Sequence, residues 1–237
     1  MQSTDAAQCL VETSPFPFAC HDALPCFTQC CKDVNIYLTP YDVLRLRQAI
    51  GTGSSEFLSK YTRSFLAKAT NIPVVQLSMD SGTLCCPFVG QEGCRVYENR
   101  PWACRMFPLD LSSTDAQFRL IAGKERCKGL FERSKGTVGD WLEAQGILEY
   151  ADMDRAFQSV VPARFKPGAA MNEGLGRLLF IAYDLDRFAE LIKDGRFATF
   201  HDVDEKMLAL AAEDTKELLK LAFRYIRAQM DELYEVL

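Results

Sequence analysis

The sequence predicts a mainly α-helical protein with a small β component, organised as a cysteine-rich N-terminal half and a helical C-terminal half. Three observations support this fold class. All ten cysteines lie between positions 9 and 127 of the 237 residues. The same half consists of short segments separated by turn residues. After it, apolar residues recur at the spacing of helices.

The strongest helix prediction covers residues 40–50. Thr39 is a suitable N-cap, Pro40 fits the first helical position, and Gly51 stands where a C-terminal glycine belongs. A second helix is expected to begin at Ser54 or Ser55 and to end near Thr70. Two short strands, 74–79 and 118–121, are expected to form a small sheet or hairpin.

Helices are expected throughout the second half. Their signals are a cap at Thr137 before Gly146, an apolar stripe from Leu175 to Ile192, Asp202 with Glu205 three residues later, and a long stripe from about Asp214 to the end. These stripes are typical of the core of a helical bundle.

Composition excludes several classes of protein. The hydrophobic share of 48% and charged share of 25% are those of a globular chain. No apolar run approaches the roughly 18 residues of a membrane span, and residues 1–5 do not resemble a signal peptide. The net charge is −5 and no basic stripe is visible. We therefore expect a cytoplasmic protein that binds neither membranes nor nucleic acid.

In a reducing cytosol, clustered cysteines favour metal binding or redox chemistry over structural disulfides. The first cluster comprises Cys20-His21, Cys26 and the adjacent pair Cys30-Cys31. Close spacing lets one metal recruit several thiolates at small entropic cost. Adjacent side chains usually diverge, so Cys30 and Cys31 could serve two metals, or different irons of one cluster.

The second cluster comprises Cys85-Cys86-Pro87, Cys94 and Cys104, and Cys127 could supply a distant last ligand. Its spacings are too long for a single zinc knuckle but suit a loop folded around a centre. A cysteine followed by proline also ends the cluster motifs of bacterial ferredoxins. We therefore expect a cysteine-rich metal-binding region over residues 1–132 and a helical region, packed on it, over residues 133–237.

These motifs resemble those of the YkgJ-type cysteine-cluster family, whose members are described as zinc- or iron-chelating domains. The resemblance covers roughly residues 18–130. It rests on Cys26 with Cys30-Cys31, Cys86-Pro87-Phe88-Val89, Cys94-Arg95-Val96-Tyr97, Arg100-Pro101 and Cys104-Arg105-Met106-Phe107-Pro108. The common form of the first motif has two further cysteines before a Cys-Gly-x-Cys-Cys run, whereas here three residues separate Cys26 from Cys30.

Motif context and cysteine density together predict eight metal ligands: Cys20, Cys26, Cys30, Cys31, Cys86, Cys94, Cys104 and Cys127. They suffice for two four-thiolate centres, or for one centre with reserve residues. Cys9 and Cys85 are expected to be ordinary buried thiols, and His21 a surface or second-shell group.

Two kinds of neighbouring residue bear on the centre. Arg95, Arg100 and Arg105 could be solvated charges or could hydrogen-bond the sulfurs. Trp102 and Phe107 are expected to pack around the centre and to keep water away.

Three functional hypotheses follow. The leading one is an iron–sulfur protein for electron transfer, sensing or structural organisation. The second is a structural zinc protein that engages a protein partner. The third is a cluster-dependent enzyme, because flagellin lysine methylases contain a similar cysteine cluster. The sequence has no His-Glu-x-x-His or Gly-x-Ser-x-Gly motif, and it leaves the question of enzymatic activity open.

Overall fold

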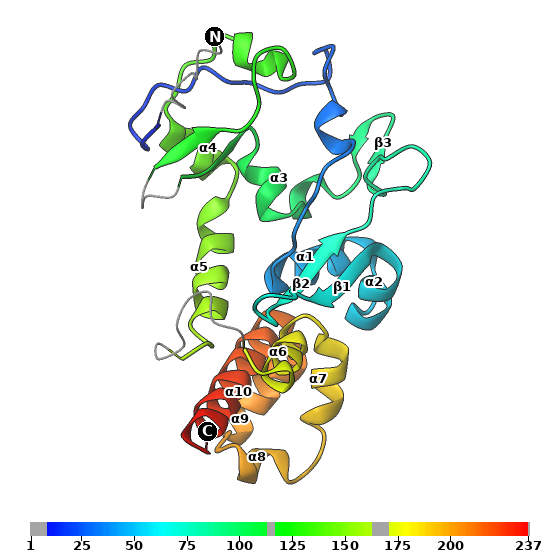
Figure 1. The fold of residues 1–237 in the computed structure, drawn as a ribbon, viewed down its shortest axis with the longest axis vertical. Helices are drawn as coiled ribbons and strands as arrows, with labels where there is room; N and C mark the ends of the chain where they lie inside the picture. The colour runs from blue at the N-terminus through cyan, green and yellow to red at the C-terminus, as the bar shows by residue number, and fades with distance from the viewer. Residues whose placement is uncertain (1–8, 113–116, 163–170, 237) are drawn as a thin grey trace. The chain divides into compact units, whose positions relative to one another are not determined.

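The computed structural model describes residues 9–112, 117–162 and 171–236. The fold is mostly helical with small two-stranded sheets (Figure 1), which confirms the predicted fold class. The chain forms two compact units. We call Met1–Ile36 with Met79–Glu149 the cysteine unit, and Tyr37–Ser78 with Tyr150–Leu237 the helical unit. This grouping differs from the boundary at residue 132 that the cysteine pattern suggested, because residues 37–78 belong with the C-terminal helices.

The cysteine unit is built from short elements. They are the 3-10 turns η1 (Gln29–Cys31), η2 (Tyr97–Asn99) and η3 (Lys128–Phe131), the strands β3 (Val89–Gly90), β4 (Gly93–Cys94), β5 (Leu109–Leu111) and β6 (Phe118–Leu120), and the helices α3 (Trp102–Met106) and α4 (Val138–Ala144). Helix α5 (Ile147–Gln158) begins in this unit and continues into the helical unit.

The helical unit contains longer elements. They are α1 (Pro40–Ile50), α2 (Ser54–Tyr61), β1 (Thr62–Leu66), β2 (Pro73–Leu77), α6 (Glu173–Leu179), η4 (Phe180–Ala182), α7 (Leu185–Leu191), α8 (Phe197–Phe200), α9 (Glu205–Glu213) and α10 (Thr215–Val236). Helix α10 packs against α9, α7 and α6 (Figure 1).

Three helix predictions are confirmed. Thr39 caps α1 in a capping box with Asp42, and Gly51 ends the helix with a φ of 68°. Thr137 makes the same box with Asp140 at α4. The last helix begins at Thr215, one residue after the predicted start.

The predicted second helix is too long. It ends at Tyr61, and Thr62 continues as β1, which pairs antiparallel with β2 from Thr62↔Leu77 to Leu66↔Pro73. Pairing with β2 outweighs the helical spacing of the local apolar residues, as tertiary contacts often do. The two strands predicted at 74–79 and 118–121 therefore do not pair with each other: the second pairs with β5.

The stripe from Leu175 to Ile192 is also not one helix. It breaks after η4, because Asp184 leaves the helical conformation and caps α7 with its side chain. Asp184 also accepts hydrogen bonds from the hydroxyls of Ser54 and Ser55 at the start of α2. At α9 the cap is Asp204, not Asp202, which has a left-handed φ of 49°.

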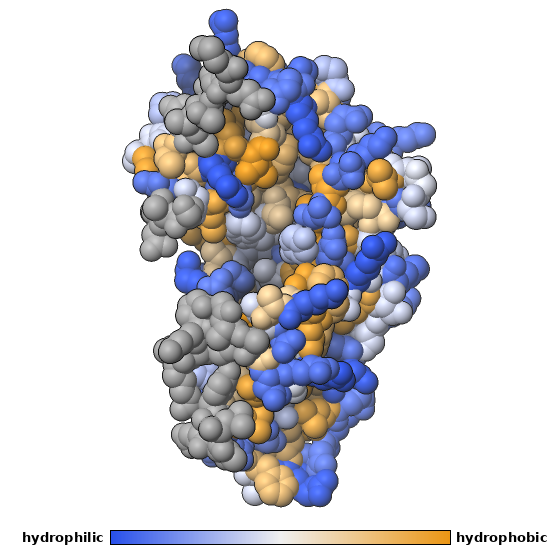
Figure 2. Space-filling model, viewed as in Figure 1, coloured by the Kyte–Doolittle hydropathy of each residue, from blue (hydrophilic) through white to orange (hydrophobic). Residues whose placement is uncertain are grey.

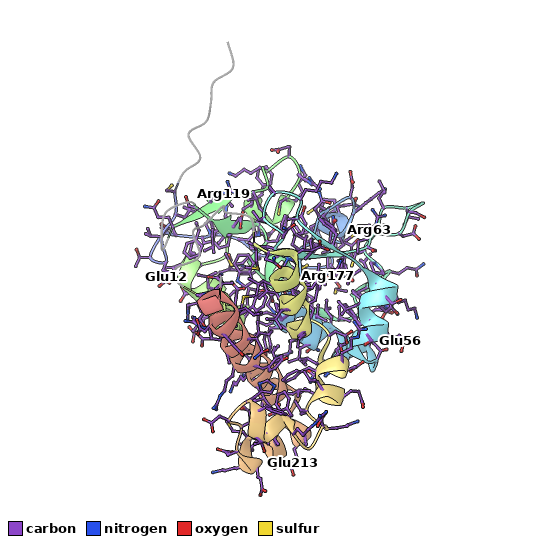
Figure 3. The ribbon with its side chains drawn as sticks, turned by 60° about the horizontal axis from the view of Figure 1, so that its bottom comes forward. Glu12, Glu56, Arg63, Arg119, Arg177 and Glu213 are labelled. Carbon is purple, nitrogen blue, oxygen red and sulfur yellow. The ribbon has the colours of Figure 1, made fainter. Side chains whose placement is uncertain are left out.

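The two units present mixed surfaces. The face drawn in Figure 2 carries hydrophobic patches between charged side chains. Surface ion pairs join Arg119 to Asp110 on the β5–β6 hairpin and Arg177 to Glu173 on α6; both arginines are labelled in Figure 3. No helix within the described ranges is long and apolar enough to span a bilayer.

Candidate metal centre

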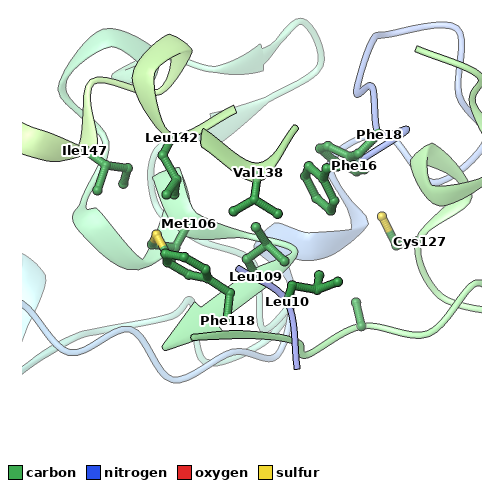
Figure 4. Close-up of a cluster of buried hydrophobic side chains, with 11 residues drawn as sticks. Leu10, Phe16, Phe18, Met106, Leu109, Phe118, Cys127, Val138, Leu142 and Ile147 are labelled. Atoms are coloured by element: carbon green, nitrogen blue, oxygen red, sulfur yellow. The ribbon is translucent and has the colours of Figure 1, made fainter. Parts of the chain in front are cut away.

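All ten cysteines belong to the cysteine unit and all are free thiols. The unit has a hydrophobic core of eleven buried residues: Leu10, Phe16, Phe18, Met106, Leu109, Phe118, Ala122, Cys127, Val138, Leu142 and Ile147. Figure 4 shows Cys127 at the edge of this cluster, on the side of Phe16 and Phe18. Cys127 is thus held in place by the core itself.

Backbone contacts bring the first cysteine segment to Cys127. The N–H of Ala19 donates to the carbonyl of Gly129 at 3.3 Å, and the N–H of Lys128 donates to Cys26 Sγ at 3.3 Å. Gly129 is required for this approach, because a Cβ there would lie 2.4 Å from the carbonyl oxygen of Ala19. These contacts place Cys20 and Cys26 beside the loop that carries Cys127.

The Cys26–Cys31 segment turns at Thr28, which has a left-handed φ of 64° and precedes η1. Counted back from the cysteine pair, Thr28 stands where the common form of the motif has glycine, the residue that adopts this conformation freely. Phe27 is then the extra residue, and its ring packs 3.1 Å from the position a Cβ would take at Gly93. The local departure from the common motif is therefore accommodated by a strained turn and an aromatic contact.

A second set of backbone contacts brings Cys31 to the later cysteines. Lys32 bridges Cys85, and the N–H of Cys86 donates to the carbonyl of Cys31 at 2.8 Å. Cys94 lies on β4 opposite Val89 of β3. Cys85 points elsewhere: its thiol donates to the carbonyl of Thr83 at 3.7 Å.

Cys104 lies on α3, which two buried arginines hold in place. Arg105 donates to the carbonyl of Gln145 at 2.5 Å and to that of Arg100 at 3.1 Å. Arg100 donates to the side chain of Gln145, and its guanidinium lies 3.7 Å from the centroid of the Tyr97 ring. Both arginines therefore fix the backbone around Cys104, and they are not solvated charges.

Cys20, Cys26, Cys30 and Cys127 act on one another electrostatically, and we call them the first thiol group. Although Cys20 is exposed as a residue, partial burial of its thiol raises its pKa to about 11, and negative charge on Cys30, Cys127 and Cys26 contributes. Burial also raises the pKa of Cys127, and charge on Cys26 and Cys30 adds to this. Deprotonating several of these thiols together thus requires a nearby cation.

We call Cys31, Cys86, Cys94 and Cys104 the second thiol group, although Cys30 of the first group also acts on Cys94. Burial is the main cause that raises the pKa of Cys86, and the charge of Cys94 adds to it. The pKa of Cys31 is raised first by its hydrogen bond to Cys30, then by burial and by charge on Cys30, Cys104 and Cys86. The same hydrogen bond lowers the pKa of Cys30 to about 7. The adjacent pair therefore connects the two groups.

Backbone N–H groups offset the cost of thiolate formation. Those of Phe88 and Val89 lower the pKa of Cys86, and those of Gly129 and Leu130 lower the pKa of Cys127. In both loops the donors follow the cysteine by two and three residues. Donors of this kind surround thiolates that bind metals.

Positive charge near the thiols comes from three arginines. Arg95 lowers the pKa of Cys86 and Cys94, Arg100 that of Cys94, and Arg126 that of Cys30. Arg95 also donates to the carbonyl of Pro87 at 2.8 Å. No cysteine motif points to Arg126, although its place next to Cys127 is a signal in the sequence.

The donor set fits a thiophilic metal, since it consists of soft thiols flanked by N–H donors and arginines. The sulfurs are not yet gathered at ligand distances: among the described residues, no three Cys, His, Asp or Glu side chains form a ready metal site. His21 Nε2 is 3.8 Å from Glu132 Oε2. Trp102 and Phe107 pack against the hydrophobic core of the unit, and that they shield a metal centre stays a prediction.

Comparison with known proteins identifies this part of the chain. Residues 19–130 match the CxxCxxCC family model, described as "Putative zinc- or iron-chelating domain". We call this matching region, slightly less than half of the chain, the CxxCxxCC domain after the family it is similar to. The match confirms the resemblance drawn from the motifs and supports metal chelation by the cysteines. No curated protein and no solved structure matches the chain. The CxxCxxCC domain includes residues 37–78 in sequence, although these fold with the helical unit.

Proposed function

We propose that the CxxCxxCC domain holds two four-thiolate iron–sulfur centres, one at each thiol group. The observation that carries this proposal is that the adjacent pair Cys30 and Cys31, hydrogen-bonded to each other, interacts with two different sets of thiols. Cys30 acts on Cys20 and Cys127, whereas Cys86 and Cys104 act on Cys31. Four thiolates are the usual ligand set of an iron–sulfur cluster.

The residues around the thiols support a charged, partly shielded centre. Phe88 is buried at 2% exposure, and Cys127 lies in the hydrophobic core. Arg95, Arg100 and Arg126 can compensate the negative charge of metal-bound thiolates, and the N–H donors stabilise it further. A bound iron–sulfur centre supplies reversible one-electron chemistry, which suits electron transfer or sensing.

Anaerobic purification followed by iron, zinc and sulfide analysis tests the nature of the metal. Brown protein that absorbs broadly near about 400 nm, with sulfide in proportion to iron, is the expected result. Colourless protein with stoichiometric zinc and no sulfide would contradict it.

Single Cys→Ser variants test the ligands and their grouping. Serine is a harder and usually protonated donor, so a ligand variant should lose metal. We expect Cys26→Ser and Cys104→Ser each to lose about half of the bound metal, and Cys85→Ser, the matched control, to retain it. Full occupancy in both Cys86→Ser and Cys104→Ser would overturn the assignment, and complete loss in every variant would indicate a single shared centre.

A structural zinc protein that engages a protein partner is the second candidate. One observation favours it: the β5–β6 hairpin and the residue after it expose Leu111, Leu120 and Ile121. Exposed apolar side chains that form a contiguous patch are typical of an interaction surface. The metal and sulfide analysis distinguishes the two candidates.

A further inference from the structure

Three aromatic side chains of the helical unit line a hollow of about 430 Å³. They are Tyr37, which precedes α1, Phe65 of β1, and Tyr183, which follows η4. The other lining residues are Leu38, Pro73, Val74 and Val75, so the lining carries no formal charge. Small-molecule sites have volumes of roughly 300–1,000 Å³ and mostly apolar walls with a few polar groups.

The backbone explains why the hollow forms. Leu38 donates from its N–H to the carbonyl of Val75 at 2.8 Å, and Tyr37 bridges Gln76, so the chain before α1 briefly extends the sheet. On the other edge of β2, Phe65 is opposite Val74. Residues directly opposite each other share a face. Tyr37 and Phe65 therefore flank β2 on one face of the sheet.

The three rings differ in exposure and in their contacts with other rings. Tyr183 is 5% exposed, and it is held by Phe157 and Phe180 at ring-centroid distances of 5.8 and 6.1 Å. Tyr37 and Phe65 are 59% and 49% exposed. The hollow thus has one fixed aromatic wall and two rings open to solvent.

Two other exposed aromatic rings, Tyr97 and Phe131, are covered by a cation, whereas Phe200 is exposed without one in the described part of the chain. Arg100 lies over Tyr97 at 3.7 Å, and Lys124 and Lys128 lie over Phe131 at 5.3 and 5.8 Å. Within the described residues, neither Tyr37 nor Phe65 has such a cation or a stacked ring. Their faces are therefore available to a cation from outside the chain.

Two carboxylates that act on Tyr183 carry negative charge, which favours a cation in the hollow. Asp42 is 1% exposed at the start of α1, and Asp154 is partly buried on α5. Burial raises the pKa of Tyr183, and the negative charges of Asp42 and Asp154 raise it further, so both carboxylates act on this ring. Arg63, labelled in Figure 3, lies on the same sheet face but is not a lining residue.

We propose that this aromatic hollow binds a methylated ammonium group. Such a cation is large and weakly hydrated, and it gains from contact with aromatic faces while its methyl groups fill apolar space. Anions are disfavoured by the two carboxylates. The site is independent of the thiol groups, and its occupation does not require the proposed metal centres.

Choline and its neutral carbon isostere, 3,3-dimethylbutan-1-ol, test the proposal on the full chain. Titrations followed by NMR should show choline binding about tenfold more tightly than the isostere, because only choline gains the cation–π contribution. Equal binding of the two probes would overturn the proposal.

Variants locate the site. Tyr37→Ala and Phe65→Ala should each weaken choline binding about fivefold or more. Phe200→Ala is the matched control, because Phe200 is 74% exposed and does not line the hollow. A loss in Phe200→Ala equal to that in the other two would overturn the assignment. An amide spectrum checks that each variant is folded.

The same group occurs on free solutes and on trimethylated lysine side chains. A short peptide with trimethyllysine, titrated beside choline, separates these sources. Tighter binding of the peptide identifies a protein-borne ligand, and tighter binding of choline identifies a solute. Failure of both probes to bind would overturn the proposal.

Discussion

Helix α10 of the helical unit places Leu219, Ala222, Ile226 and Met230 at zero exposure along one face. The cysteine unit has no comparable element among its described residues: its α3 and α4 have five and seven residues, and its strands two or three. Its backbone is fixed instead by side chains, among them Arg100 and Arg105, and by contacts between loops.

The two units therefore differ in their source of stability. Burial of an apolar stripe is sufficient for the helical unit, since most helical stability in proteins comes from packing of one face. In the cysteine unit, burial and neighbouring thiols raise the pKa of Cys20, Cys31, Cys86, Cys94 and Cys127, so a bound metal would contribute directly to folding.

Metal removal is the strongest test of this difference. A chelator should abolish amide protection in residues 9–36, 79–112 and 117–149 and leave 37–78, 150–162 and 171–236 largely protected. Hydrogen exchange with mass spectrometry measures both. Residues 37–78 are the informative part, because they lie inside the family domain but fold with the other unit. Equal loss of protection in both units would show one cooperative fold.

Truncating a core side chain of the helical unit should have the opposite effect: it should lower stability and leave the metal bound. Ile226→Ala leaves a cavity at a side chain with 0% exposure, and should cost about 2–5 kcal/mol of unfolding free energy without changing metal content. Denaturant unfolding and metal analysis measure the two quantities. Leu233→Ala on the same helix, at 45% exposure, is the control and should have little effect. Loss of metal in Ile226→Ala would mean that the units are coupled.

A single methyl group should disturb the first thiol group. Gly129→Ala puts a Cβ 2.4 Å from the carbonyl oxygen of Ala19 and 2.7 Å from the Phe18 ring, so the segments carrying Cys20 and Cys127 must separate. We expect a cost of about 1–3 kcal/mol and a lower metal content.

Gly195→Ala is the matched control for this change. A Cβ at Gly195 meets nothing within 4 Å, while the change in the unfolded chain is the same. Metal titration and thermal unfolding compare the two variants. An unchanged metal affinity in Gly129→Ala would separate this contact from the site.

Substitutions in the two capping boxes should have the smallest effect on stability, and they compare the two units directly. Thr39→Ala removes the hydroxyl that accepts from the N–H of Asp42 at 3.1 Å, and should cost about 0.5–2 kcal/mol with or without metal. Thr137→Ala removes the same bond at α4 of the cysteine unit, at 3.2 Å. Its cost should appear only in the metal-loaded protein. If both variants lost the same stability with and without chelator, the two units would not differ in their dependence on metal.

The sequence predicted helices best where local chemistry decides the conformation. Thr39, Pro40 and Gly51 set the ends of α1 through hydrogen bonds within the helix and its caps. The end of α2 could not be predicted in this way, because it depends on pairing of Thr62–Leu66 with a strand that begins seven residues later. The break before α7 likewise depends on Asp184 reaching Ser54 and Ser55, which are distant in the sequence.

The same distinction between local and long-range contacts applies to the candidate site. Motif spacing pointed to the eight thiols, and the structure shows electrostatic interactions among them; that they bind metal stays a prediction. The buried roles of Arg100 and Arg105 depend on Gln145, about 40 residues away, and contacts of this length leave no mark in local sequence. The contact of Cys85 with Thr83 is local, but cysteine spacing does not reveal it.

The interleaving of the two units has a consequence for biosynthesis. The chain leaves the cysteine unit after Ile36 and returns at Met79, so α1, α2 and the β1–β2 pair emerge from the ribosome long before their packing partner α10. By contrast, the last cysteine is made at position 127 and the cysteine unit ends at Glu149. Metal can therefore be acquired before residues 37–78 pack against the C-terminal helices. Early metal loading would shorten the time in which exposed thiols can be oxidised.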